Sequence, residues 1–183
     1  MTEYSQSDYT KHYIVEALFR LMETKPFSEI TVTELTRKAG VGRVTFYRNF
    51  KDKESVIIYF FDRHKTRFGL QRSVAPRNDA DYYDKIRDVM NTLRTYKHTL
   101  RLILSSHLEY LYLDYLNENF ARDFRENYDA ASLTPYAYSG ALFNVSMQWL
   151  KTDCAEPSEC VADALFTEMF GKERLSALKA RSK

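Results

Sequence analysis

The sequence predicts an all-α protein of about nine helices, and three observations support this fold class. Its 183 residues include only 5 glycines and 4 prolines, fewer than the many turns of a sheet-rich fold require. Hydrophobic residues make up 44% of the chain and charged residues 28%, which is enough for a packed core. Apolar residues recur at spacings of three and four, as on one face of a helix.

Helical periodicity and its breakers divide the chain into nine expected helices and a charged tail. Pro26 ends the first helix, and a polar stretch at 73–81 separates the fourth from the fifth. Pro157 is expected at the first position of the last helix, and the tail Lys172 to Lys183 is expected to fray. The expected helices are 8–24, 32–39, 43–49, 52–68, 81–97, 99–105, 107–129, 135–151 and 157–170.

The second and third helices are expected to form a helix-turn-helix. Thr31 and Glu34 have the spacing of a capping box, in which side chain and backbone exchange hydrogen bonds at a helix start. Gly40 suits the left-handed backbone that ends such a helix. Gly42 then lies at the N-cap of the next helix, where Ser, Thr, Asn or Asp is more usual. Two short helices joined by a tight turn are typical of DNA readers.

The third helix has one apolar side and one polar side. Phe46 and Phe50 share the side expected to face the core, whereas the arginines and Tyr47 point outward. Between Lys25 and Lys53 there are seven basic and three acidic residues, although the net charge of the whole chain is only +2. This local excess favours a polyanion as partner, but a solvated surface of mixed charge stays an alternative.

The run from Pro26 to Glu54 resembles the DNA-binding domain of TetR/AcrR-type transcriptional regulators, in particular the branch with Arg-x-Thr-Phe-Tyr in the recognition helix. The resemblance rests on a threonine-capped helix, the Ala-Gly-Val turn at 39–41, the Arg43-to-Lys51 helix region and a Lys-Glu start of the fourth helix. It covers about residues 10–65. Gly42 departs from the family pattern, which commonly has Ser or Asn there.

The resemblance implies a DNA-binding domain at 1–52, with the fourth helix as connector to about residue 70, and a helical regulatory and dimerisation domain at 53–183. Arg43 and Arg48 would read bases, because a guanidinium can bind guanine O6 and N7 together. Thr45 would contact a phosphate or a base, and Tyr47 would donate its hydroxyl to a phosphate. Lys53, together with Thr33, would hold the DNA backbone. The full set of expected DNA-binding residues is Thr33, Arg43, Val44, Thr45, Tyr47, Arg48, Asn49, Lys51 and Lys53. A packing role for Tyr47, and simple solvation for Lys51 and Arg37, stay open.

The same resemblance implies a homodimer formed by the final two helices, with double-stranded DNA bearing a pseudo-palindromic operator as partner. Gly140 and Ala141 would allow close approach of helices across a twofold axis, and ordinary packing within the chain is the alternative. The residues expected at the dimer interface are Gly140, Ala141, Phe143, Asn144, Met147, Leu165 and Met169.

No cofactor or metal is expected, and no catalytic residue is assigned. The four histidines lack the spacings of zinc sites, although His98, His107 and Glu109 could converge. Cys154 and Cys160 form either two plain thiols or a redox switch. Without a signal peptide or a long apolar stretch, a cytoplasmic location away from membranes is expected.

The aromatic residues of the C-terminal part allow two interpretations. They form either a core with a dimer interface or the lining of a cavity for a small-molecule effector of unknown identity. The expected function is a dimeric repressor of the TetR type. The alternatives are a helical protein–protein interaction module, or a regulator controlled by a partner without a small-molecule ligand; an enzyme is a third and poorer one.

Overall fold

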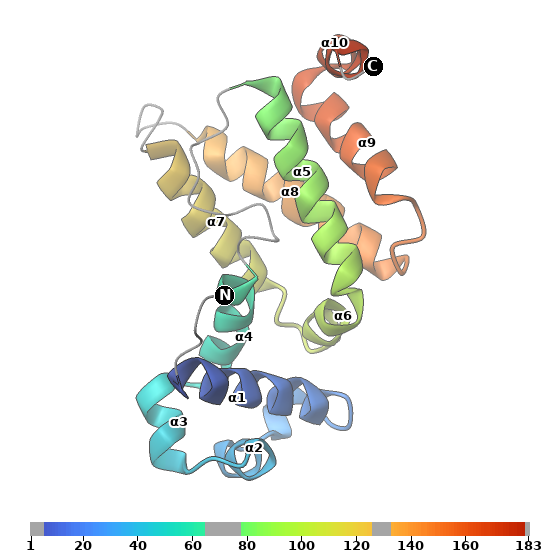
Figure 1. The fold of residues 1–183 in the computed structure, drawn as a ribbon. Coiled ribbons are helices and arrows are strands. Elements are labelled where there is room, and N and C mark those ends of the chain that lie inside the picture. Colours follow the sequence, from blue (N-terminus) through green and yellow to red (C-terminus); the bar gives the residue numbers. More distant parts are fainter. Residues whose placement is uncertain (1–5, 65–77, 126–132, 182–183) are drawn as a thin grey trace. The chain divides into compact units, whose positions relative to one another are not determined.

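The computed structural model describes residues 6–64, 78–125 and 133–181, and within these ranges it contains α-helices, one short 3-10 helix and no strand. Figure 1 shows the helices in chain order. Their bounds are α1 Gln6–Met22, η1 Phe27–Glu29, α2 Val32–Ala39, α3 Arg43–Asn49, α4 Lys53–Arg63, α5 Asp79–Thr95, α6 Lys97–Ser105, α7 Tyr110–Arg125, α8 Thr134–Lys151, α9 Ser158–Phe170 and α10 Lys172–Arg181.

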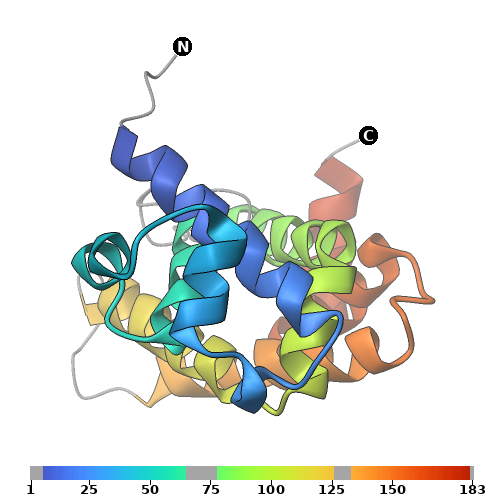
Figure 2. The ribbon, with the colours of Figure 1, turned by 90° about the horizontal axis from the view of Figure 1, so that it is seen from below.

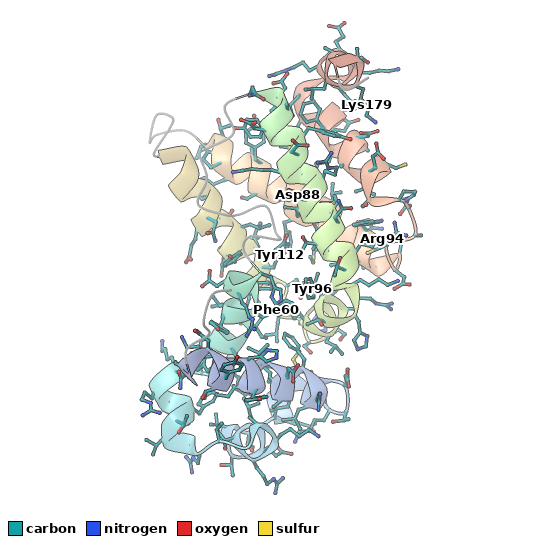
Figure 3. The ribbon with its side chains drawn as sticks, viewed as in Figure 1. Phe60, Asp88, Arg94, Tyr96, Tyr112 and Lys179 are labelled. Atoms are coloured by element: carbon teal, nitrogen blue, oxygen red, sulfur yellow. The ribbon has the colours of Figure 1, made fainter. Side chains whose placement is uncertain are left out.

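The all-α class is confirmed, and the described ranges contain ten helices where about nine were expected. The additional one is α10, in the tail that was expected to fray. Two of its basic residues are ion-paired: Arg174 contacts Asp79 of α5, and Lys179, labelled in Figure 3, contacts Asp163 of α9. In the sequence this charged segment looks like a solvated tail, because the acidic residues that pair with it lie more than fifteen positions away.

Two helix starts also differ from expectation. Pro157 is the N-cap of α9 with extended backbone (φ −57°, ψ 139°), and not its first helical residue. His107 has a left-handed backbone with φ 56° and lies in the turn before α7, which begins three residues later, at Tyr110. Both segments were expected to be helical from these residues onward.

The described residues fall into two compact units. One lies within Met1–Arg63 and Leu102–Leu111, the other within His64–Arg101 and Tyr112–Lys183. The structure therefore groups α4 with the helices that precede it. The domain division at residue 52 stays a prediction.

In the first unit, α1 packs against both α2 and α4, and α2 against α3. Figure 2 shows α3 towards the N-terminal half of α1. Phe60 of α4, labelled in Figure 3, meets Phe19 of α1 edge-on, with ring centroids 5.1 Å apart. The side chains with no exposed surface in this core are Ile14, Leu18, Leu35, Phe46, Val56, Ile57 and Phe61.

In the second unit, α5 lies alongside α9, and both of these helices contact α8 and α10. The indole Nε1 of Trp149 donates to the carbonyl of Glu156, which joins α8 to the loop before α9. Tyr112 of α7 is buried, and burial raises its pKa well above the usual range, although a hydrogen bond with Ser146 of α8 opposes the rise. Tyr112 and Trp149 thus lie in the core of the unit, while the dimer interface and the effector cavity stay predictions.

Candidate nucleic-acid interface

The turn between α2 and α3 has the geometry that its glycines predict. The hydroxyl of Thr31 accepts from the amide of Glu34, and the Glu34 carboxylate accepts from the amide of Thr31, so the expected capping box is present. Gly40 ends α2 with φ 70° and ψ 27°, the left-handed region that suits glycine. The amide of Val41 reaches back to the carbonyl of Thr36 at 3.0 Å. These local bonds hold the start of α3 at a defined angle to α2.

Lys25 strengthens the capping box in a way that the sequence did not reveal. Its ammonium lies 2.7 and 2.6 Å from the two carboxylate oxygens of Glu34. This hydrogen bond, followed by the one from the Thr31 amide, holds the pKa of Glu34 below its ordinary value. The carboxylate thus binds the end of the α1 region and the start of α2 together.

The side of α3 that faces the core is aromatic. Phe46 has no exposed surface and Phe50 is buried, with their ring centroids 5.9 Å apart. Their predicted core role is confirmed. Because this side of the helix is anchored in the core, the backbone positions of the outward-facing residues are fixed as well.

The outward side of α3 carries hydrogen-bonding groups around one apolar side chain. Arg43 and Arg48 are exposed, and Tyr47 is 53% exposed even though its ring meets the edge of Phe46. Val44 is 82% exposed. Guanidinium, phenol and a small apolar group are suited to phosphates, base edges and thymine methyl groups, respectively.

Thr45 and Asn49 have roles within the first unit. The Asn49 Nδ2 donates to the Thr45 carbonyl at 2.7 Å, and its Oδ1 accepts from the Ser7 hydroxyl at 3.1 Å. Asn49 therefore connects the last turn of α3 to the first turn of α1. Both residues are half-buried, and contact with DNA stays a prediction for them. No local pattern could have identified Ser7, because it lies 42 residues from its partner.

Lys51 and Lys53, which follow α3, differ in whether their ammonium groups face solvent or the protein. Lys51 is exposed. Lys53 instead donates from Nζ to the carbonyls of Phe27 at 2.7 Å and Ile30 at 2.6 Å, and its ammonium lies 4.4 Å from the centre of the Phe27 ring. Burial lowers the pKa of Lys53. Its geometry is that of a residue that positions the end of η1, and a phosphate contact is a prediction that the structure leaves untested.

The remaining expected DNA-binding residue, Thr33, is exposed in the first turn of α2. Thr33, Lys51 and the outward side of α3 are all exposed, so this part of the expected DNA-binding site is accessible to a ligand. Gly42 is the N-cap of α3 with extended backbone and offers no side-chain hydrogen bond, so the start of the helix is bare there.

The residues expected at a dimer interface are only partly brought together. Ala141, Asn144, Leu165 and Met169 line an open, mostly apolar groove of about 570 Å³ between α8 and α9. The other expected residues are outside its lining. These are Gly140, Phe143 and Met147.

The other candidate groups give no site of their own. Cys154 is buried, which raises its pKa, while Cys160 is exposed, and both are free thiols. In the parts of the chain that the structure describes, no three His, Cys, Asp or Glu side chains are arranged to hold a metal ion. Among the described helices, none combines the length and the apolar character that crossing a bilayer would require.

Comparison with known proteins finds a sequence similarity within the first unit. Residues 14–59 match the sequence profile of "Bacterial regulatory proteins, tetR family". This segment is similar to the tetR family. The HTH-type transcriptional regulator EthR of Mycolicibacterium smegmatis is 49% identical over 43 residues, which are 24% of this chain and 20% of EthR. The chain thus spans about a fifth of the length of that curated relative.

Solved structures extend the likeness of fold to most of the chain. Lin0861 from Listeria innocua has a TM-score of 0.73 at 17% identity, covering 90% of this chain and 91% of that one. A TetR transcriptional regulator from Streptococcus agalactiae has a TM-score of 0.60 at 20% identity, covering 89% and 94%. The fold of these structures, a helix-turn-helix segment followed by a helical domain, is therefore the fold of this chain. These comparisons do not test the assignment to the branch with Arg-x-Thr-Phe-Tyr, which stays a prediction.

Proposed function

We propose that the chain is a sequence-specific DNA-binding transcriptional regulator, a dimeric repressor of the TetR type that reads a pseudo-palindromic operator with α3. The observation that carries the proposal is the two-sided α3, fixed to the core by Phe46 and exposing Arg43, Val44, Tyr47 and Arg48. The tetR-family match of residues 14–59 supports it. We assign the chain no enzymatic activity and propose that it acts in the cytoplasm.

DNA titrations test the assignment of the reading surface. Operator sequences are first selected from random duplexes, and binding is then followed by fluorescence anisotropy. We expect Arg43→Ala and Tyr47→Ala to weaken binding, whereas Arg87→Ala, which removes an exposed arginine of α5, serves as the charge-matched control. Affinity should fall with salt at a log–log slope of about −0.9 per neutralised phosphate. Unchanged affinity of both α3 variants would refute the site.

The groove between α8 and α9 supports a homodimer. Its apolar lining is open in the single chain and contains Ala141, Leu165 and Met169 of the expected interface. Two copies would place their α3 helices in successive major grooves about 34 Å apart. Ala164→Glu puts a charge into the lining, and Ala180→Glu at an exposed position of α10 is the control. Sedimentation should give monomer for the first variant and dimer for the second; a dimer for both would move the interface elsewhere.

We propose further that a signal acting on the second unit controls operator affinity. A ligand achieves this only if it binds the DNA-competent and DNA-incompetent forms with different affinity. A small-molecule effector and a protein partner both satisfy this condition. Operator titration in the presence of a cell extract, before and after removal of its proteins, separates the two cases.

A further inference from the structure

Val44 is the most exposed of the large hydrophobic side chains in the described part of the chain, at 82%. It lies in the first turn of α3, next to Arg43, and one turn before Tyr47 and Arg48. The position is therefore an apolar one within the surface proposed to contact DNA.

The fold gives no reason for a valine at this position. Phe46 and Phe50 already anchor α3, and Val44 lies outside that contact. A β-branched residue is also a weaker helix former than alanine, lysine or glutamate, any of which an exposed position would accept. What the valine side chain contributes is a rigid apolar surface, since one χ1 rotamer dominates in a helix.

The major groove has one apolar group that such a side chain can contact. Each base pair presents hydrogen-bond donors and acceptors there, and thymine adds its C5-methyl group. The two methyl groups of Val44 form no hydrogen bond, so they cannot replace a guanidinium or an amide at a base edge. They can remove a thymine methyl group from water, and the fixed rotamer limits the entropy cost of the contact.

We propose that Val44 selects a thymine in each operator half-site by contact with its C5-methyl group. This inference rests on the proposed function, because it needs α3 in the major groove. Arg43 precedes Val44 in the chain and Tyr47 and Arg48 share its face of the helix, so the selected thymine lies beside the base or phosphate that one of these contacts.

The test removes the methyl group from the DNA and from the protein in turn. Each thymine of the selected operator is replaced by deoxyuridine, which differs only by the methyl group, and affinity is measured by anisotropy. For the wild type we expect deoxyuridine at one position in each half-site to lower the affinity about fourfold, which is the effect of losing one buried methyl group. Val44→Ala should bind the natural operator more weakly and should be insensitive to deoxyuridine at that position.

Two controls keep the outcome clear. Deoxyuridine at the other thymines should affect the wild type and Val44→Ala equally, and Val44→Ile should keep the sensitivity. Urea unfolding of Val44→Ala should show no loss of stability, because the removed methyl groups are exposed and alanine is the better helix former.

The inference is overturned if every deoxyuridine effect is the same in wild type and Val44→Ala, or if the selected half-site contains no thymine. In either case the proposed function stands, since the protein still binds its operator. Absence of any selected sequence and of salt-dependent binding would overturn the proposed function, and the inference with it.

Discussion

Replacing Lys53 by methionine tests whether this residue serves the fold or the DNA. Methionine keeps an unbranched stem but removes the ammonium that bonds to the carbonyls of Phe27 and Ile30. Hydrogen bonds from charged groups contribute about 1.5–3 kcal/mol each. The cation–π contact with Phe27 adds about 0.5–1 kcal/mol. The cost of partly burying the ammonium opposes both contributions.

We expect Lys53→Met to lower the free energy of unfolding of the first unit by about 2 kcal/mol, which is less than the sum of these contributions because the cost of burying the ammonium is removed as well. Urea unfolding followed by circular dichroism measures this decrease. Fluorescence of Trp149, the single tryptophan, reports on the second unit and should change little. Lys51→Met is the matched control, since it removes an exposed charge and should change stability by less than about 0.5 kcal/mol.

The salt dependence of DNA binding then distinguishes the two roles. If Lys53 bound a phosphate in each copy of a dimer, its replacement would reduce the log–log slope by about 1.8. We expect Lys53→Met to leave the slope nearly unchanged. A native urea midpoint combined with a reduced slope would refute the assignment and make Lys53 a phosphate-binding residue.

Three further predictions concern the turn and the capping box. Gly42→Asp should stabilise the first unit by a few tenths of a kcal/mol by capping α3, yet weaken DNA binding through its negative charge; equal or tighter binding would contradict this. Gly40→Ala should destabilise by about 1 kcal/mol because of its left-handed backbone and not because of crowding, and Gly40→Asn should cost less in the same urea titration. The pKa of Glu34 is lowered in the fold, so the stability that its contacts with Lys25 provide is present above the ordinary value of 4.5 and is lost as the pH falls through the lowered value. Glu34→Gln should therefore be less stable at neutral pH and show a smaller loss on acidification, and identical pH profiles would exclude the contact.

Features determined by neighbours in the sequence were predictable. The capping box at Thr31, the left-handed Gly40 and the bare N-cap Gly42 each depend on residues within a few positions. The burial of Phe46 and Phe50 follows from their spacing on one helix. These features identify the helix-turn-helix and its outward surface.

Features that depend on distant partners were not predictable. The inward position of Lys53 depends on carbonyls 23 and 26 residues away. The bond from Ser7 to Asn49 joins residues 42 positions apart. In the same way, α10 looks like a frayed tail until the carboxylates of α5 and α9 are placed beside it. A charged or polar residue in the sequence does not indicate which group will neutralise it.

In α3 the residue that packs into the core differs from the residues that face outward, and this separation affects how the outward surface can change in evolution. The residue that holds the helix in place, Phe46, is separate from those that face outward, and exchange of Arg43, Val44 or Arg48 leaves the buried core unchanged. Surface substitutions of this kind change stability by less than about 0.5 kcal/mol. Under the proposed function, one copy can therefore acquire a new operator after gene duplication through single substitutions, while selection on its fold stays the same.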